Sequence, residues 1–280
     1  MAPDFVVIGH VVRDVIPGGW RLGGTATFAA VQAQRLGLVV GVVTRAGPDI
    51  SLPELLPKMS LAGRQSKATT TFENIYADGH RRQRVLEQAE GLSADDVPAE
   101  WRSAPLVLMG PVCGEVPAEL AEVFPQSLAG VSAQGWLRGL DADRRVQRQA
   151  WSGAPFWRGA RIVFVSDEDL EGHEEQVDRW ADETPIVAVT RAGRGARVHS
   201  DGAWREIAAF PADEIDPTGA GDVFAAAFLA RLHETDGVAD ATRFACAAAA
   251  CSVEGPGTDR IAGRDVIEER MARHPEIALR

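Results

Sequence analysis

Short apolar runs alternate with longer amphipathic stretches along this chain. Five of the runs look like strands that are buried on both faces, because they are apolar almost without interruption. They cover residues 4–9, 38–44, 105–110, 160–166 and 185–190. The pattern predicts a central sheet with both of its faces covered.

Helix candidates lie between and after these runs, at residues 24–37, 166–183 and 219–234. The second has an acidic first turn, and the third places Val223, Ala226, Ala227 and Ala230 on one face. Strands that alternate with helices favour an α/β fold with a mostly parallel sheet. No linker or internal repeat divides the chain, so we expect one domain over residues 1–280.

One segment breaks the alternation. Residues 67–88 show a strand-like stretch from Thr69 to Tyr76, a turn at Asp78-Gly79 and a second, polar strand. This pattern is typical of a hairpin. We expect a small β lid outside the main sheet, formed in part by about 66–88, and an ordinary edge hairpin is the alternative.

Composition narrows the function classes. The formal net charge of -11 disfavours a general nucleic-acid or anionic-membrane binder, because phosphate binding needs a concentrated basic face. Only Lys58 and Lys67 among the 29 basic residues are lysines, so a fixed positive charge near a substrate is expected to be arginine. Three cysteines without zinc spacing, and no apolar tract long enough to span a membrane, predict a reduced, cytoplasmic protein.

The stretch EIDPTGAGDVF carries the clearest candidate chemistry. Gly219, Ala220 and Gly221 are expected at a helix start, where free N–H groups and the helix dipole favour an anion. Asp222 would then act as a general base on a hydroxyl that attacks a phosphoryl group held there. The alternative is an acid that only stabilises the helix start, by roughly 0.3 to 1 kcal/mol. A Walker P-loop is excluded, and a GxGxxG fingerprint after the first strand is missing, which weakens a dinucleotide oxidoreductase.

The string DPTGAGD resembles the signature of the ribokinase-like (PfkB-type) carbohydrate kinase family. Further segments resemble family elements in the expected order: VIGHVVRDV, GGTATFAAVQAQRLG, TTTFENIY, VFVSDEDL, VAVTRAGRGARV and AAAACSVEGPGT. The resemblance implies a three-layer sandwich with a small β lid, ATP as phosphate donor, Mg²⁺, and a monovalent cation such as K⁺. It also allows a homodimer through the lid.

The resemblance implies roles for individual residues. Asp222 matches the catalytic base, and Gly219, Ala220 and Gly221 match the anion hole. Substrate positions are Asp14, Gly23 and Gly24, and nucleotide positions are Thr190, Gly193, Gly195, Gly255 and Gly257. Asp216 matches an aspartate that helps to hold a monovalent cation, and Asp169 matches a glutamate that acts on magnesium, usually through water.

Two departures from the family pattern bear on the substrate. The family's N-x-x-E motif is Ser166-Asp167-Glu168-Asp169 here, which an acidic helix start would also produce. Phe28 stands where ribokinases have a sugar-binding asparagine, and a phenylalanine cannot hydrogen-bond a hydroxyl. Phe28 either contacts the apolar face of a cyclitol or packs in the core.

The segments GHVVRDV, TTTFENIY and AQGWLR are similar to those of inositol kinases. They add Asn74, Gln134 and Arg138 as substrate candidates. Strand alternation leaves open whether Asn74 or Glu73 faces the pocket, and a salt bridge is the alternative for Arg138. We expect a kinase that phosphorylates myo-inositol or a related cyclitol. A nucleoside or other sugar kinase, and a non-catalytic sugar- or nucleotide-binding regulator, are the alternatives.

Overall fold

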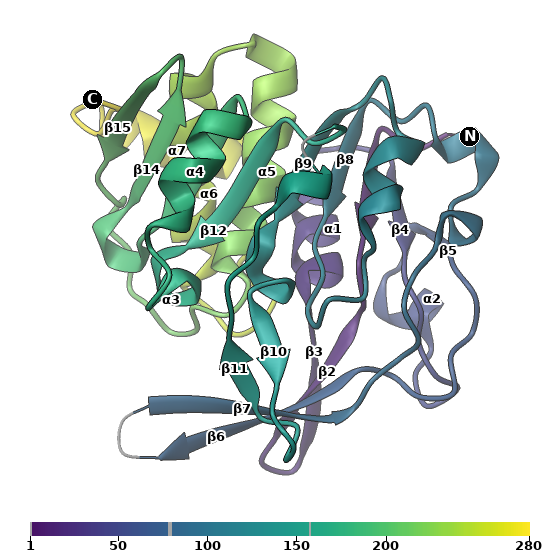
Figure 1. The fold of residues 1–280 in the computed structure, drawn as a ribbon. Coiled ribbons are helices and arrows are strands. Elements are labelled where there is room, and N and C mark those ends of the chain that lie inside the picture. Colours follow the sequence, from purple (N-terminus) through teal and green to yellow (C-terminus); the bar gives the residue numbers. More distant parts are fainter. Residues whose placement is uncertain (1, 78–79, 157) are drawn as a thin grey trace.

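A nine-stranded sheet forms the centre of the molecule (Figure 1). The computed structural model describes residues 2–77, 80–156 and 158–280. The strand order is β15-β14-β13-β12-β9-β8-β1-β4-β5, and neighbours pair in parallel except for β13-β14 and β14-β15. The strands are β1 (Phe5–Ile8), β4 (Val40–Val43), β5 (Ser60–Ala62), β8 (Leu106–Met109), β9 (Leu128–Ser132), β12 (Ile162–Ser166), β13 (Ile186–Thr190), β14 (Ala196–Ser200) and β15 (Ala203–Ile207). The five predicted strands are β1, β4, β8, β12 and β13.

Helices cover both faces of this sheet. Phe5 and Val7 of β1 pack with helices on one face, whereas Val6 and Ile8 belong to the core on the other face. The first face carries α1 (Thr25–Arg35), α5 (Ala220–Thr235), α6 (Val238–Ser252) and α7 (Arg264–Arg273). The second carries α3 (Asp167–Leu170), α4 (Gln176–Glu183) and the 3₁₀ helices η2 (Ala99–Trp101), η3 (Ala118–Val123) and η5 (Ala154–Phe156). The predicted three-layer α/β sandwich is therefore confirmed.

The remaining helices are short. They are α2 (Leu52–Leu55) and the 3₁₀ helices η1 (Ala94–Asp96), η4 (Ala133–Gly135) and η6 (Ala192–Arg194). Within the described part of the chain, no helix has the length and apolar character needed to cross a bilayer.

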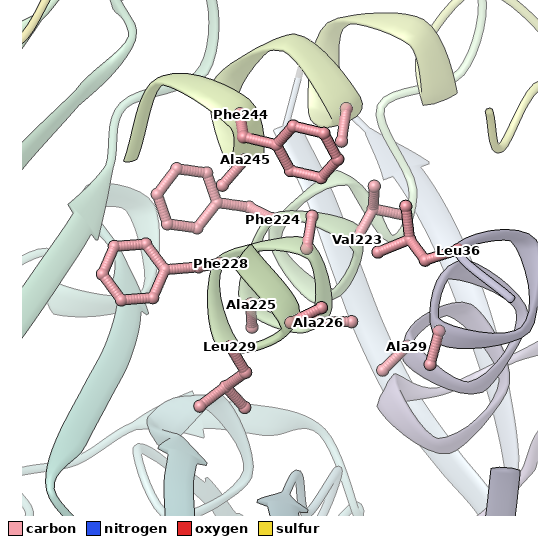
Figure 2. Packing of buried hydrophobic residues seen from close by; sticks show 14 of the residues in the cluster. Ala29, Leu36, Val223, Phe224, Ala225, Ala226, Phe228, Leu229, Phe244 and Ala245 are labelled. Carbon is pink, nitrogen blue, oxygen red and sulfur yellow. The ribbon is translucent and has the colours of Figure 1, made fainter. Parts of the chain in front are cut away.

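Helix α5 is buried over most of its circumference. Every residue from Val223 to Ala230 is buried, not only the face that the sequence pattern marked. The helix lies between α1 and α6 (Figure 2), and its alanines allow these neighbours to approach closely. Burial on all sides fixes the start of α5 firmly relative to the sheet.

The helix expected over residues 166–183 is interrupted. Ser166 caps α3, which ends at Leu170, and α4 begins only at Gln176. Gly172 has a φ of 83° in the connection, a left-handed conformation that ends a right-handed helix. The single long helix was therefore a wrong prediction.

A separate small sheet projects from one edge of the molecule (Figure 1), with the strand order β3-β2-β6-β7. Its strands are β2 (Val12–Ile16), β3 (Gly19–Gly23), β6 (Thr71–Ala77) and β7 (His80–Glu87). The hairpin expected at 66–88 is thus β6-β7, and it does not pair with the edge of the large sheet. Its expected Asp78-Gly79 turn lies outside the described residues. A two-stranded ribbon of β10 (Arg138–Leu140) and β11 (Val146–Arg148) lies beside it, bridged from Arg145 to Arg84.

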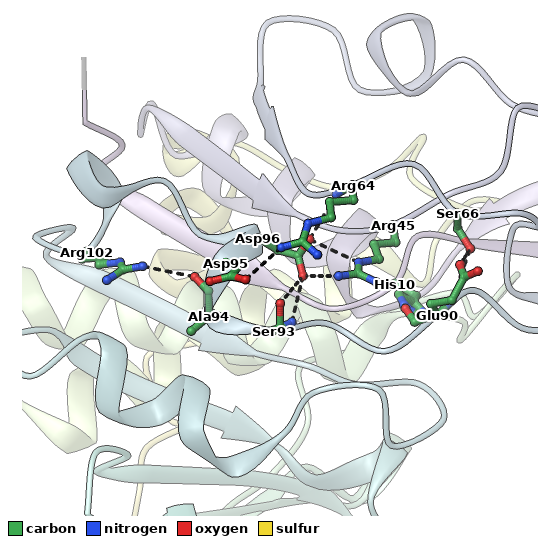
Figure 3. Close-up of polar contacts among 10 residues, drawn as sticks. All are labelled: His10, Arg45, Arg64, Ser66, Glu90, Ser93, Ala94, Asp95, Asp96 and Arg102. Carbon is green, nitrogen blue, oxygen red and sulfur yellow. Dashed lines mark hydrogen bonds and ion pairs between the residues drawn. The ribbon is translucent and has the colours of Figure 1, made fainter.

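Polar contacts tie the base of the β6-β7 hairpin to the end of β1. The two ring nitrogens of His10, which is fully buried, lie 2.9 Å from Thr70 Oγ1 and 3.1 Å from the Glu90 carbonyl. Ser66 and Glu90 form a hydrogen bond next to His10 (Figure 3). Because His10 contacts both ends of the hairpin, the position of the small sheet is set by the large one.

Candidate active site

A cleft of about 580 Å³ lies where the carboxyl ends of the parallel strands meet the small sheet. Ser132, Ser166 and Thr190 mark the ends of β9, β12 and β13 at its wall. Ligands of open α/β sheets bind at this edge. Thirteen of the predicted site residues line the cleft, namely Asp14, Gly24, Phe28, Gln134, Arg138, Asp169, Thr190, Gly193, Gly195, Gly219, Ala220, Gly221 and Asp222.

The start of α5 forms one end of the cleft. Gly219 precedes the helix with φ 79° and ψ 0°, a left-handed conformation that suits glycine. The N–H groups of the first turn have no acceptor within the helix, because the helix has no carbonyl four residues before them. The Ala220 N–H donates to the Pro217 carbonyl at 3.2 Å, whereas a β-carbon at Gly221 would meet no atom within 4 Å. The backbone at Gly221 is therefore open to close approach by an anion.

The ring of Phe28 packs against the start of α5. A β-carbon on Gly219 would lie 2.2 Å from the ring of Phe28, and Phe28 is only 1% exposed. The ring borders the cleft but packs in the core with α5. Of the two roles considered for Phe28, the structure favours core packing, because little of the ring is left for a substrate to contact.

Asp222 lies in the first turn of α5 and faces the cleft. Burial raises the pKa of Asp222 to about 6, and the charge of Asp169 adds to this effect. The Thr25 hydroxyl and the Arg138 guanidinium act in the opposite direction, since they favour the carboxylate. The Thr25 hydroxyl is close enough for this influence but makes no hydrogen bond of ordinary geometry. A carboxyl group with this pKa is ionised at neutral pH and still basic enough to accept a proton.

Asp169 places a second carboxylate at the cleft. Its N–H donates to Ser166 Oγ at 3.0 Å, and the Ser166 hydroxyl donates to Asp169 Oδ2 at 2.6 Å. Gln134 Nε2 lies 3.3 Å from the same oxygen, and Arg138 Nη2 lies 3.7 Å from Oδ1. Ser166 therefore caps α3, as expected for an acidic helix start, and Asp169 also lines the cleft, so that its role toward magnesium stays a prediction. Likewise, Arg138 lines the cleft and also forms an ion pair.

The small sheet supplies one side of the cleft. The Asp14 carboxylate lies over Gly23, where a β-carbon would come 2.1 Å from Asp14 Oδ2. Phe72 lines the cleft, so Asn74, two positions further along β6, is on the same face and Glu73 is on the other. Gln83, opposite Asn74 on β7, donates to Asn74 Oδ1 at 3.0 Å and reaches the cleft. Gln83 was missed from sequence because its position depends on the hairpin register.

The other end of the cleft has an apolar wall beyond the start of α5. Thr190, Gly193 and Gly195 border it, and a β-carbon on Gly195 would lie 2.0 Å from the Ile207 carbonyl oxygen. The wall consists of Ala209, Phe210, Pro211, Ala212, Cys246, Ala249, Ala250 and Val253. Gly23, Asn74, Asp216, Gly255 and Gly257 are not among the residues that line the cleft.

Asp216 is engaged by the chain itself. Its Oδ1 accepts from the Thr218 N–H at 3.0 Å, and its Oδ2 accepts from the Gly257 N–H at 3.1 Å and from Arg21 Nη1 at 2.7 Å. The expected monovalent cation does not fit this carboxylate well, because a guanidinium already lies against it. Among the described residues, no group of three or more His, Cys, Asp or Glu side chains is arranged to hold a metal ion.

Comparison with known proteins relates this site to the carbohydrate kinases. Residues 150–262, which include α5 and Asp222, match the pfkB family of carbohydrate kinases. A cytidine kinase of Thermococcus kodakarensis is 28% identical over 81% of this chain and 87% of its own length. An inositol 3-kinase of rice (Oryza sativa subsp. japonica) is 29% identical over 81% of this chain, but only 62% of the rice protein is covered. The chain is therefore similar to the pfkB carbohydrate kinases, and the comparisons support a phosphotransferase of the class that acts on an alcohol group.

Solved structures agree on the fold. A pyrophosphate-dependent kinase of the ribokinase family, complexed with a pyrophosphate analog and myo-inositol, superposes with a TM-score of 0.78 over 95% of this chain and 99% of that one, at 23% identity. Ribokinase of Arabidopsis thaliana, complexed with ribose and ATP, gives 0.76 over 97% and 99%, at 20% identity. The fold is therefore ribokinase-like.

Proposed function

We propose that this protein is an ATP-dependent kinase that transfers the γ-phosphoryl group to a hydroxyl of myo-inositol or a related cyclitol. The observation that carries the proposal is Asp222, a carboxylate with a raised pKa beside the open first-turn backbone of α5. A base and an anion seat must lie this close together, because both act on one reacting centre.

In the proposed reaction the acceptor hydroxyl lies between Asp222 and the phosphoryl group. Its oxygen attacks the γ-phosphorus while its proton passes to the Asp222 carboxylate. A new P–O bond forms, the bond to the β-phosphate oxygen breaks, and ADP leaves with that electron pair. The N–H groups at the start of α5 stabilise the charge that develops on the transferred group, and the cleft walls hold the two reactants in line.

Mg²⁺ fits this cleft as a partner of the phosphates. Mg²⁺ keeps several waters and takes hard oxygen ligands, and the described residues form no group of three or more His, Cys, Asp or Glu side chains that would enclose it. Asp169, held in place by Ser166, would contact the ion through water. Bound there, Mg²⁺ would neutralise phosphate charge.

The apolar wall supports a nucleotide as donor. Phe210 and the small residues of α6 offer a surface for a base, which pyrophosphate would not use. Pyrophosphate would instead benefit from extra cations, and Arg138 is the only Lys or Arg among the described residues that line the cleft. The experiment described below compares ATP and pyrophosphate as donors.

Two observations support a cyclitol as acceptor. The rice relative is named inositol 3-kinase, and the lining of the cleft combines Asp14 with the amides of Gln83 and Gln134. These groups suit several hydroxyls, since an amide both donates and accepts. A nucleoside is the second candidate, because the relative with 28% identity is named cytidine kinase.

The test is a coupled ADP-release screen with ATP and Mg²⁺ over myo-inositol, other cyclitols, ribose, fructose and cytidine. We expect the highest kcat/KM for a cyclitol, confirmed by phosphate on the sugar in ³¹P NMR. A parallel screen replaces ATP by pyrophosphate. A nucleoside or ketohexose at least about tenfold better than any cyclitol would refute the acceptor assignment and leave the kinase assignment intact. No ADP release with any acceptor would refute ATP as the donor, and no phosphorylated product in either screen would refute the acceptor and kinase assignments together.

A further inference from the structure

One ion pair connects the small sheet to the loop that leads into α5. Arg21 is on β3, and its Nη1 lies 2.7 Å from Asp216 Oδ2, across 195 positions of sequence. The Asp216 side chain is only 11% exposed, whereas that of Arg21 is 35% exposed. Asp216 precedes Gly219 by three residues, so the arginine acts directly on the segment that shapes the anion seat.

The carboxylate of Asp216 already accepts three hydrogen bonds from the chain. Thr218 and Gly257 donate their N–H groups to its two oxygens, and Arg21 supplies the positive charge. Burial alone would raise the pKa of Asp216, but the Thr218 and Gly257 hydrogen bonds and the Arg21 charge hold it below its usual range. The loop is therefore stabilised by a cation that belongs to the chain.

Arg21 also lies next to the acceptor side. In the antiparallel pair of β2 and β3 it is directly opposite Asp14, whose carboxylate lines the cleft. Two residues after Arg21, Gly23 lies under that carboxylate. The same strand thus supports the acceptor-side aspartate and reaches the loop before the anion seat.

Building on the proposed kinase function, we propose that the Arg21 guanidinium takes the place of a monovalent cation beside the anion seat. Arg21 is then a positioning residue, and the enzyme does not depend on K⁺. This differs from the expectation drawn from Asp216 in the sequence, where the carboxylate was a potential K⁺ ligand. The structural reason is the 2.7 Å contact, which leaves the carboxylate already neutralised.

The experiment compares the unaltered protein with Arg21→Ala and, as a milder variant, Arg21→Gln. Activity is measured in KCl, NaCl and tetramethylammonium chloride at equal ionic strength, with and without millimolar guanidinium. The control is Arg13→Ala, which removes a similar Arg–Asp pair of 2.5 Å, to Asp49, from the neighbouring strand. Arg13 is next to Asp14 and so is on the opposite face of β2.

We expect the unaltered protein and Arg13→Ala to have the same kcat in all three salts. Arg21→Ala and Arg21→Gln should lose about tenfold or more in tetramethylammonium, because a buried carboxylate is left unpaired, and K⁺ or guanidinium should restore most of the loss. Activation of the unaltered protein by K⁺ overturns the proposal. So does an Arg21 variant with unchanged activity, or one whose loss neither cation repairs.

Melting temperature gives a second readout that needs no acceptor. The Tm of the Arg21 variants should rise when K⁺ replaces tetramethylammonium, whereas that of the unaltered protein should not. If no acceptor is phosphorylated, the kinase proposal fails, and the Tm comparison still decides whether Arg21 fills a cation site. Equal Tm shifts in all proteins would refute that role.

Discussion

The ring of Phe28 lies directly against the backbone of Gly219, so that a β-carbon at Gly219 would come 2.2 Å from it. Phe28 belongs to α1 and Gly219 to the start of α5, and both helices are held by the same core. The left-handed conformation of Gly219 and the position of the first N–H groups of α5 thus depend on a hydrophobic contact. The contact with Phe28 therefore sets the position of the backbone N–H groups that form the proposed anion seat.

We expect Gly219→Ala to lose both stability and activity. A side chain at φ 79° costs about 1 kcal/mol, and overlap with the Phe28 ring adds about 1–3 kcal/mol. Displaced N–H groups should lower kcat by about 10². Gly221→Ala is the matched control for packing, because its β-carbon meets nothing within 4 Å. It should keep the Tm and still lower activity, since its methyl group enters the space open to the donor.

The contact between the two residues can be tested by a double-mutant cycle. Phe28→Ala makes space for the added methyl group, so Gly219→Ala should cost less Tm in the Phe28→Ala background than alone. Thermal unfolding of the four proteins measures this difference. Additive losses would contradict a direct contact.

Asp222→Asn should keep the fold and lower kcat by roughly 10² to 10⁴, because asparagine cannot accept the proton. Asp265→Asn is the control, since Asp265 is an exposed acid in the first turn of α7. It tests whether any first-turn acid gives the same effect through the helix dipole. A variant of Asp222 with more than half of the original turnover would exclude it as the base.

The charged neighbours of Asp222 should shift the midpoint of the pH profile of kcat/KM. The base works as a carboxylate, so activity should fall as the pH drops through about 6. Arg138→Gln removes a charge that favours the carboxylate and should move the midpoint up, whereas Asp169→Asn removes a charge that opposes it and should move the midpoint down. Initial rates between pH 5 and 8 measure both. Shifts in the same direction for the two variants would contradict this account.

Local patterns predicted the layers of the fold better than its connections. Continuous apolar runs identified five strands, but β9 was missed because Gly130 weakens its pattern. A β-carbon there would lie 2.8 Å from the ring of Phe164, so glycine is required by packing against β12. Likewise, Gly172 divides a segment with continuous helical character.

The residues of the candidate site likewise differ in whether the sequence alone identifies them. Asp222 and its glycines stand together in the sequence, so their shared position at one cleft could be predicted from it. Gln83 enters the cleft through the hairpin register, and Arg21 meets Asp216 only because the small sheet folds over the loop. Contacts between residues this far apart are fixed by tertiary structure, which no local pattern contains.

The raised pKa of Asp222 also predicts an effect on stability that requires no substrate. In the unfolded chain its pKa is near 3.8, and in the folded protein it is about 6, so the folded state binds the proton more tightly. The contribution of Asp222 to stability is therefore greatest below about pH 4 and is lost as the pH rises through 6. Above pH 6 the desolvated carboxylate opposes folding.

Asp222→Asn removes this penalty, so the variant should be more stable than the unaltered protein above pH 6 and lose that advantage below pH 4. Each kcal/mol regained corresponds to about 2–4 °C in Tm. Thermal unfolding of both proteins at pH 4, 6 and 8 measures the trend, and Asp265→Asn should show no comparable rise. A Tm difference that stays constant or shrinks as the pH rises would mean that Asp222 is not held in the buried, proton-retaining environment that the proposed base requires.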